Sequence, residues 1–372
     1  MVKPRICGGA YTSGQQKRGK RWCAMIELVL TVCLAGDPAV CAKRMLPRTA
    51  VVSQMECEAS AGARIEAWQM QHPDLRIAKQ ACETPDIAPL PVTEIADGIW
   101  MHKGLHEIPT PQNAGDLANI GFVVGQHAIA VIDAGGSRDV AERLLAAIRQ
   151  VSDLPVEYLV LTHMHPDHMM GASLFMDMGA QILGHENLPA ALASRAETYQ
   201  ANYGRLIGSQ RMILSDAVPV EALTTGIAEI DLGGRFLHLA QTPTAHTDND
   251  LRLFDDLTAT LWAGDLVFAE HTPALDGSIT GWLSVLDDLR ASKADRVVPG
   301  HGPVSLPWPE GMRDVYGYLA AIAQETRAAI KQGESLSVAI THVGESQRDK
   351  WLLFDEFNAR NATAAYTELE WE

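Results

Sequence analysis

The sequence predicts an α/β protein, and three observations support this. Segments with the period of strands alternate with segments of helical period across short connections. The alternation occurs twice, in two halves of similar design. Histidine- and aspartate-bearing loops directly follow several of the strands. The composition fits such a domain, because 47% apolar and 20% charged residues in a chain of 372 are ordinary for a globular protein with a large core.

The first half contains compact apolar runs separated by segments of helical spacing. Val140, Leu144, Leu145 and Ile148, for example, lie on one face of a predicted helix. Predicted strands occupy residues 98–102, 119–124, 128–132, 156–161 and 181–183, and predicted helices occupy residues 140–151, 172–178 and 188–205.

The second half repeats the design after an irregular stretch at residues 212–229. Predicted strands occupy residues 236–240, 251–254, 259–262 and 296–298, a helix occupies 282–291, and further helices follow residue 312. Two similar halves are consistent with two sheets packed face to face and helices outside. The pattern alone leaves the order of the layers open.

All six cysteines precede residue 83. Four of them are expected to form two disulfides in an oxidising compartment, with the pairing left open: Cys33, Cys41, Cys57 and Cys82. Their spacing is too wide for the C-x-x-C pairs of a zinc knuckle.

The N-terminal residues allow two interpretations. Residues 1–24 are basic, and an apolar stretch interrupted by Glu27 follows, which is the outline of a signal peptide. Alternatively translation begins at Met25, and residues 26–34 form a strand.

The chain is predicted to divide into four parts. These are a basic leader or non-native extension at 1–24, a cysteine-containing segment at 25–85, a linker at 86–93 and the main domain with C-terminal helices at 94–372.

The formal net charge of −16 argues against a nucleic-acid-binding surface, since phosphate contacts need Lys and Arg. No apolar run is long enough to predict a transmembrane helix. A small-molecule substrate is expected, and the sequence leaves the oligomeric state open.

One loop concentrates four candidate metal ligands. The sequence His163-Met164-His165-Pro166-Asp167-His168 directly follows the predicted strand at 156–161. Neutral imidazoles and carboxylates are the ligands that zinc takes in catalytic sites. His163 and His165 can face one metal, while Asp167 and His168, further round the turn, can face a second.

Three more candidate ligands each follow a predicted strand: His246, Asp265 and His301. Gly264, Gly300 and Gly302 flank them, as expected where the backbone bends sharply near a site. Taken singly, a Gly-Asp pair or a Gly-His-Gly is usually only a turn. Their combination and order make a metal site the better interpretation.

This order of ligands resembles the metallo-β-lactamase superfamily over about residues 93–305. The resemblance implies an αββα four-layer sandwich and two zinc ions, with iron as an alternative metal. It implies His163, His165 and His246 as ligands of one metal, and Asp167, His168 and His301 as ligands of the second. Asp265 takes the bridging position, which is similar to the dinuclear site of glyoxalase II and unlike the cysteine of the true β-lactamases.

A narrower resemblance, to the quinoprotein relay system zinc metallohydrolases, comes from residues 119–122, 246–250, 264–268, 273–278 and 281–282. It implies an association with a quinoprotein alcohol dehydrogenase system and a periplasmic location, with the cytoplasm as the alternative.

The resemblance implies a hydrolase in which a hydroxide shared by two metals attacks an ester, thioester, lactone or amide carbonyl, with Asp167 and Asp265 as the catalytic carboxylates. Two other classes stay open: a mononuclear iron enzyme similar to the persulfide dioxygenases, and a non-catalytic accessory protein. For several other side chains two interpretations stay open. Each can take part in the site, or it can be an ordinary turn, packing or surface residue: Asp133, Asp248, Asp250, His102, His106, His185, His271, Phe268 and Trp282.

Overall fold

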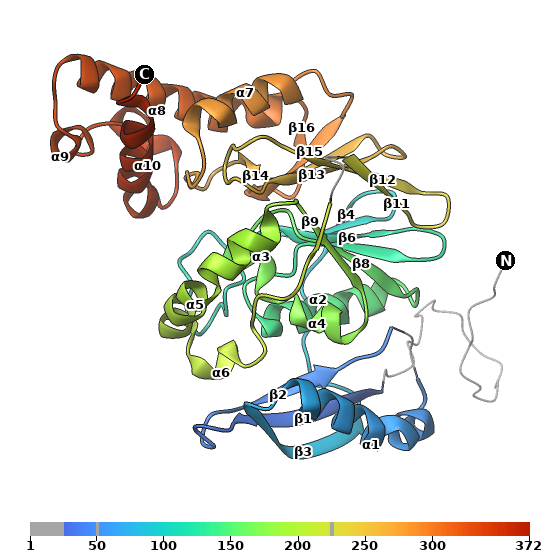
Figure 1. Ribbon diagram of the computed structural model, residues 1–372. Coiled ribbons are helices and arrows are strands. Elements are labelled where there is room, and N and C mark those ends of the chain that lie inside the picture. Colours follow the sequence, from blue (N-terminus) through green and yellow to red (C-terminus); the bar gives the residue numbers. More distant parts are fainter. Residues whose placement is uncertain (1–25, 50–51, 224–226) are drawn as a thin grey trace, which may run out of the picture.

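The computed structural model describes residues 26–49, 52–223 and 227–372. The expectations for residues 1–24 lie outside this range. Within it, the chain forms three sheets, one small and two large, as Figure 1 shows. The small sheet has the order β2-β1-β3, and the large ones have the orders β10-β9-β8-β7-β6-β5-β4 and β11-β12-β13-β14-β15-β16.

The first large sheet is built from the first half of the main domain. Its strands are β4 (Thr93–Ala96), β5 (Ile99–His102), β6 (Ile120–Val124), β7 (Ile129–Ile132), β8 (Val156–Val160), β9 (Gln181–Gly184) and β10 (Glu221–Ala222). β7, β8, β9 and β10 run parallel, and the connections between them carry the helices α2 (Arg138–Val151), α3 (Pro166–Met169), α4 (Ser173–Asp177), α5 (Leu188–Ile207) and α6 (Ser209–Met212).

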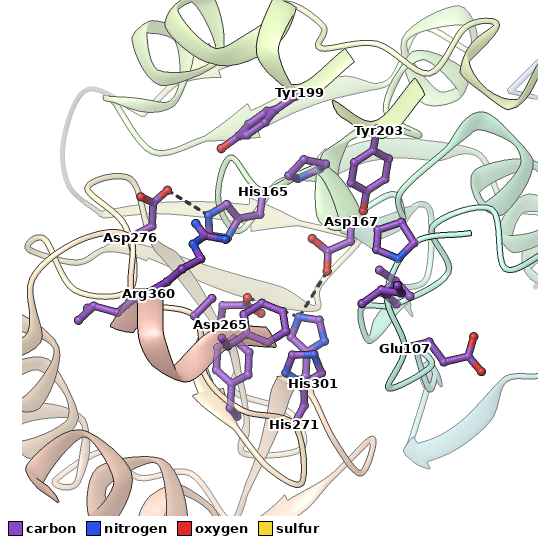
Figure 2. A pocket seen from close by; sticks show the side chains of 18 of the residues that line it. Glu107, His165, Asp167, Tyr199, Tyr203, Asp265, His271, Asp276, His301 and Arg360 are labelled. Atoms are coloured by element: carbon purple, nitrogen blue, oxygen red, sulfur yellow. Dashed lines mark hydrogen bonds and ion pairs between the residues drawn. The ribbon is translucent and has the colours of Figure 1, made fainter. Parts of the chain in front are cut away.

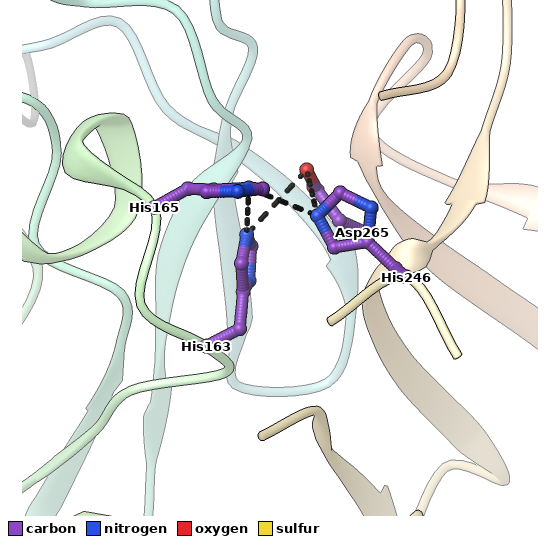
Figure 3. A group of neighbouring side chains, drawn as sticks. All are labelled: His163, His165, His246 and Asp265. Atoms are coloured by element: carbon purple, nitrogen blue, oxygen red, sulfur yellow. Dashed lines mark hydrogen bonds and ion pairs between the residues drawn. The ribbon is translucent and has the colours of Figure 1, made fainter. Parts of the chain in front are cut away.

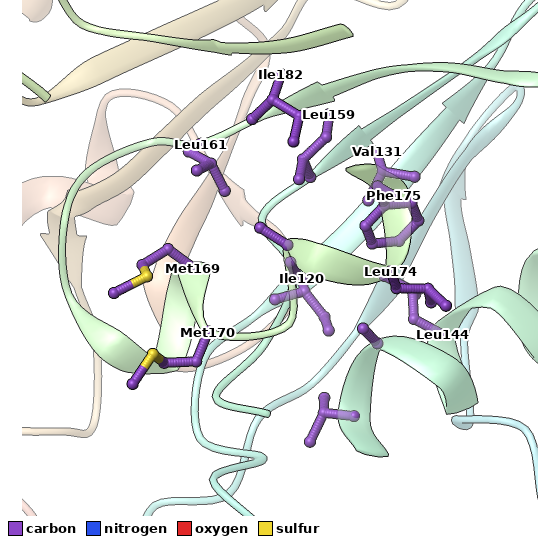
Figure 4. Packing of buried hydrophobic residues seen from close by; sticks show 14 of the residues in the cluster. Ile120, Val131, Leu144, Leu159, Leu161, Met169, Met170, Leu174, Phe175 and Ile182 are labelled. Carbon is purple, nitrogen blue, oxygen red and sulfur yellow. The ribbon is translucent and has the colours of Figure 1, made fainter. Parts of the chain in front are cut away.

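The strands of this sheet alternate between two cores. Ile129 and Val131 of β7 face the helices. Figure 4 shows Val131 in this core together with Leu144 of α2 and Phe175 of α4. Ala130 and the other alternate side chains face the second large sheet. The α2 helix begins at residue 138 because the Ser137 side chain accepts a hydrogen bond from the backbone of Val140.

The second large sheet closes the sandwich. Its strands are β11 (Ile227–Asp231), β12 (Phe236–Gln241), β13 (Leu251–Asp255), β14 (Thr260–Phe268), β15 (Arg296–His301) and β16 (Leu306–Pro307). Leu239, Leu253 and Trp262 of this sheet pack between the two sheets. The order helix, sheet, sheet, helix confirms the predicted αββα sandwich.

Helices from the end of the chain cover the outer face of the second sheet. They are α7 (Ile279–Leu289), η1 (Glu310–Met312), α8 (Arg313–Lys331), α9 (Leu336–Ala339), η2 (Glu345–Lys350) and α10 (Phe354–Leu369). Trp282 of α7, Tyr318 of α8 and Ala365 of α10 share the core beneath them. In the part of the chain that the structure describes, no helix is both long and apolar enough to span a membrane.

The cysteine-containing segment forms the small sheet. Its elements are β1 (Glu27–Leu34), β2 (Cys41–Leu46), α1 (Gln54–Gln71) and β3 (Leu75–Glu83). Of the two interpretations of this apolar stretch, the strand is observed, since β1 lies between β2 and β3. The disulfide Cys33–Cys41 joins the adjacent ends of β1 and β2, and Cys57–Cys82 fastens α1 to β3.

Buried charges attach this small sheet to the main domain. Arg138 of α2 donates a hydrogen bond to the carbonyl of Met45 at 2.7 Å, and Glu142 accepts one from the backbone of Met45 at 2.7 Å. Arg138 also pairs with Asp177 of α4 at 2.7 Å. Each buried ion thus has a partner, as burial of charge requires.

The main departure from the predicted elements lies at residues 212–229, which were expected to be irregular. Two short strands, β10 and the start of β11, fall in this stretch. β10 has only two residues, and they pair with Leu183 and Gly184 of β9. A strand of this length carries no period of its own, so only the tertiary pairing reveals it.

Labelling of thiols in unfolded, unreduced protein is expected to leave Cys33, Cys41, Cys57 and Cys82 unmodified, because all four are paired. Peptide mapping should recover the pairs Cys33–Cys41 and Cys57–Cys82. The control is the same protein after reduction, in which all four become labelled. Alkylated Cys57 or Cys82 in the unreduced sample would contradict this pairing.

Candidate metal centre

The seven predicted ligands come together at one end of the sandwich. The loop after β8 carries His163 and His165 and leads directly into α3, which carries Asp167 and His168. His246 lies between β12 and β13, whereas Asp265 and His301 belong to β14 and β15, which run parallel. All seven fall into two groups whose potential ligand atoms lie within 4.8 Å of one another.

The first group consists of His163, His165, His246 and Asp265 (Figure 3). The Nδ1 atom of His165 lies 3.1 Å from Nε2 of His163 and 3.0 Å from Nε2 of His246. The Oδ2 atom of Asp265 lies 3.6 Å from Nε2 of His163 and 3.3 Å from Nε2 of His246. Four ligand atoms thus surround one point.

The second group consists of Asp167, His168 and His301. Nε2 of His301 lies 3.4 Å from Oδ2 of Asp167, and Nε2 of His168 lies 3.8 Å from that oxygen. Asp265 also reaches this group, with Oδ1 3.1 Å from Nε2 of His168 and Oδ2 3.5 Å from Nε2 of His301. Asp265 therefore contacts both groups, as its predicted bridging position requires.

Gly300 leaves the space that Asp265 occupies. A Cβ atom at residue 300 would lie 1.8 Å from Oδ1 of Asp265. Because that oxygen is buried, it could not move aside without displacing the carboxylate from the two groups. The glycine before His301 is thus explained by close approach.

Hydrogen bonds fix the tautomers of the histidines in the first group. His246 Nδ1 donates to the carbonyl of Ala274 at 2.6 Å, and His165 Nε2 lies 3.3 Å from the carboxylate of Asp276. His163 Nδ1 lies 3.0 Å from the Thr162 hydroxyl, whose proton is committed to Asp133. Each remote nitrogen therefore carries the proton, and each nitrogen inside the group keeps a lone pair.

This arrangement fits a bound cation. Three nitrogen lone pairs only 3.0 and 3.1 Å apart repel one another unless a positive charge lies between them. Ligands about 2.0–2.1 Å from a tetrahedral zinc ion are separated from one another by roughly 3.3 Å. In addition, His168 Nε2 and Asp265 Oδ1 are buried and lie 3.1 Å apart, but neither forms a hydrogen bond of good geometry with the other or with another described residue. Such orphaned atoms are expected of metal ligands.

Burial and the carboxylates shift the pKa values at the site in opposite directions. Burial lowers the pKa of His246 to about 3 and the pKa of His163 well below its usual value. Burial also lowers the pKa of His168, but Asp265, Asp133 and Asp167 together outweigh it and raise the pKa. The negative charge that favours protons there would equally favour a metal cation.

Asp133 supports the site from behind. Its Oδ2 atom accepts hydrogen bonds from Nδ1 of His168 at 2.8 Å and from the hydroxyl of Thr162 at 2.8 Å, while Oδ1 accepts from the Thr162 backbone. It thereby orients His168 directly and His163 through Thr162. In this structure Asp133 therefore contacts residues of the site and is not simply a turn carboxylate.

Asp133→Ala is expected to lower metal affinity about 10- to 100-fold, the usual cost of losing a group that orients ligands. The Asp133 contact with His168 is buried, so water cannot replace it fully. Isothermal titration of metal-free protein with zinc measures the change. Asp231→Ala, which removes an exposed carboxylate at the end of β11, is the control. Equal zinc affinity in Asp133→Ala and native protein would disprove the supporting role.

The two groups form one wall of a cavity of about 310 Å³ (Figure 2). His165, Asp167, Asp265 and His301 line it from the sandwich. Other side chains line it from α5 and from the C-terminal helix α10: Arg195, Tyr199, Tyr203, Phe357, Arg360 and Asn361. The candidate metal centre is therefore open to a small molecule on one side.

Some of the other candidate residues from the sequence lie at the cavity, whereas others have purely structural contacts. His271 and Phe268 line the cavity and stack on His301, with ring centroids 4.8 and 5.0 Å away. His102 instead binds Asp116 at 2.7 Å, and His185 caps the backbone of Asn187.

The other candidate residues lie near the site but belong to neither group of potential metal ligands. His106 lies beside His271, with ring centroids 5.9 Å apart. Asp250 holds the turn after His246 through Thr247, and Asp248 accepts from the side chain of Asn249. Trp282 is buried, with its ring centroid 5.1 Å from that of His246.

Sequence reasoning missed the polar residues that surround the cavity. Asp276 binds His165, and Arg195 binds Asp276 at 2.9 Å. Arg195, Tyr199 and Tyr203 recur every fourth residue along α5, and this spacing was the available signal. Nothing in the local pattern distinguishes Arg360 from other exposed helical arginines.

Comparison with known families agrees with this geometry. The model of the metallo-beta-lactamase superfamily matches residues 114–301, about half of the chain. That range contains all seven residues of the two groups. The chain belongs to the metallo-β-lactamase superfamily.

Two curated relatives share parts of the chain. The linear primary-alkylsulfatase of Pseudomonas sp. (strain ATCC 19151) is 27% identical in an alignment of 220 residues that covers 47% of this chain and 40% of that protein. The beta-lactamase-like protein 2 homolog of Caenorhabditis elegans is 25% identical over 185 residues, which are 49% of this chain and 55% of that protein. The match thus spans about half the length of these relatives.

Among solved structures, a double mutant of the sec-alkyl sulfatase PisA1 aligns with a TM-score of 0.54 and 17% identity. The alignment covers 76% of this chain and 51% of that one. At this identity the likeness concerns the fold.

Proposed function

We propose that this protein is a dinuclear zinc hydrolase that acts on an ester, thioester, lactone or amide carbonyl. One observation carries the proposal: two groups of inward-facing ligand atoms share the carboxylate of Asp265 at the wall of an open cavity. Structural zinc sites, by contrast, are closed by four ligands. The open cavity therefore favours catalysis over a purely structural site.

The proposed roles follow from the positions of the side chains. His163, His165 and His246 would hold the first ion, Asp167, His168 and His301 the second, and Asp265 both. Two zinc ions held by these residues would supply an activated water and would polarise the carbonyl oxygen of the substrate. Asp167 is 17% exposed, so it can also accept a proton from substrate or solvent in the cavity.

Metal analysis separates this proposal from a mononuclear iron enzyme. Protein purified without added metal is expected to contain about two zinc per chain, because the second group has its own three ligands. One iron per chain would favour the redox alternative. The second group would then have no metal to hold.

A substrate panel tests the reaction class. It should contain 4-nitrophenyl acetate, a thioester, a lactone, 4-nitrophenyl sulfate and nitrocefin, assayed with and without a chelator. We expect chelator-sensitive hydrolysis of at least one carbonyl substrate and little hydrolysis of nitrocefin, because Asp265 stands where true β-lactamases have cysteine. Turnover of the sulfate ester alone would instead place the activity with that of the alkylsulfatase relative.

We also propose that the protein serves a quinoprotein alcohol oxidation system in the periplasm. The resemblance in residues 264–268 and 273–278 supports the association. The disulfides Cys33–Cys41 and Cys57–Cys82 support an oxidising compartment. Fractionation of the native host, followed by detection of the protein with an antibody, tests the location.

A further inference from the structure

Two helices from distant parts of the chain line the cavity together with the candidate metal ligands. The α5 helix contributes Arg195 and Tyr199, and α10 contributes Phe357 and Arg360. In Figure 2 the Arg360 side chain extends from its helix into the cavity. Both helices therefore present cationic groups to whatever binds next to the metals.

The two arginines at the cavity differ in whether a carboxylate neutralises their charge. Arg195 pairs with Asp276 at 2.9 Å, and Asp276 also contacts His165 at 3.3 Å. For Arg360, no hydrogen bond or ion pair with any other described residue exists. Its guanidinium therefore offers its donors to the cavity.

The acidic residues in the cavity are committed elsewhere. Asp167 and Asp265 face the two metal groups, and Asp276 is bound by Arg195. Glu107 accepts a hydrogen bond from the Asn113 side chain at 3.1 Å and lies on the opposite side of the cavity from Arg360 in Figure 2. No carboxylate of the described residues neutralises Arg360.

We propose that Arg360 binds an anionic group of the substrate, a carboxylate or a sulfate, while the scissile bond lies at the metal centre. This inference rests on the proposed hydrolase function and narrows its substrates to small organic anions. A planar guanidinium suits such a group, because it can donate two parallel hydrogen bonds to its oxygens. Tyr199 can add a third donor, because its hydroxyl is buried at the cavity and has no hydrogen-bond partner among the described residues.

Ligand binding to the zinc-loaded protein tests whether Arg360 anchors the anionic group of the substrate, and it does not require turnover. Calorimetry would compare glutarate, propane-1-sulfonate as a non-hydrolysable analogue of a sulfate ester, and uncharged glutaramide in native protein and in Arg360→Gln. Loss of a hydrogen bond to a charged group should weaken at least one of the two anions on the order of 10-fold or more, and glutaramide much less. The anion that is weakened more identifies the carboxylate or the sulfate as the preferred group.

Matched variants separate the anchor from general charge effects. Arg360→Lys should retain part of the anion affinity, and Arg313→Gln, an exposed arginine outside the cavity, should retain all of it. Zinc content should be equal in all of these proteins. Equal anion affinity in native protein and Arg360→Gln, or no anion binding by native protein, would overturn the proposal.

Kinetics then distinguish failure of the anchor from failure of the proposed function. The ratio of kcat/KM for mono-4-nitrophenyl glutarate to that for 4-nitrophenyl valerate should fall at least about 10-fold in Arg360→Gln. An unchanged ratio would contradict the anchor but not the hydrolase. If native protein cleaves neither ester, ester hydrolysis fails as a function, and the calorimetry alone decides on Arg360.

Discussion

Asp265→Ala is expected to lower the affinity for both metal ions and to reduce hydrolysis by on the order of 100-fold or more, beyond the usual cost of losing an orienting group. The reason is geometric. Oδ2 of Asp265 lies 3.3 Å from Nε2 of His246, and Oδ1 lies 3.1 Å from Nε2 of His168. Among the carboxylates of the described residues, only Asp265 lies within ion-pair distance of histidines in both groups.

Zinc titration of metal-free Asp265→Ala, monitored by calorimetry, measures both affinities at once. His301→Ala is the matched comparison, since it should weaken mainly the second ion. Asp256→Ala removes an exposed carboxylate outside the site and should change neither affinity. Two tightly bound zinc ions in Asp265→Ala would refute the bridging role.

His163→Ala is expected to remove one of the two metal ions and nearly all hydrolysis. His163 is 1% exposed and supplies one of three nitrogens around the first position. Water entering the space left by the ring could not restore a ligand oriented through Thr162. The same result is expected for His165→Ala and His246→Ala.

Elemental analysis of purified variants, with activity measured on the best substrate of the panel, checks this expectation. His238→Ala is the control, because His238 is a partly exposed residue of β12 that pairs with Asp256 outside the site. Circular dichroism would show that each variant folds. A folded His163→Ala protein with full metal content would show that this residue is no ligand.

The sequence predicted most of the sandwich because its strands carry a clear local signal. The runs at β7 and β8 are short and wholly or largely apolar, and ligand-bearing loops follow β8 and β15 directly. The order of the layers depends on which faces of the strands meet, and no local pattern encodes this. Only the family resemblance supplied the αββα arrangement before the structure was known.

The ligand groups were predictable for a similar reason. Four of the candidate ligands lie within six residues, and the glycines beside Asp265 and His301 mark close approach. Residues that act across long sequence separations were not predictable. Asp276 meets His165 from 111 residues away, and Arg360 reaches the cavity from a helix near the end of the chain.

The cysteine pairing shows the same limit. Four cysteines allow three pairings, and the sequence indicated only that two disulfides form. The register of β1 against β2 places Cys33 opposite Cys41, which leaves Cys57 of α1 to meet Cys82 of β3. Register is set by the whole sheet rather than by the spacing of the cysteines.

Anomalous diffraction from crystals of the native protein, recorded on both sides of the zinc absorption edge, tests the central claim most directly. Two zinc peaks are predicted about 3.5–4 Å apart, as in other two-metal sites. One should lie among His163, His165 and His246, the other among Asp167, His168 and His301, with Asp265 in contact with both. A single peak, or a signal at the iron edge alone, would contradict a dinuclear zinc hydrolase.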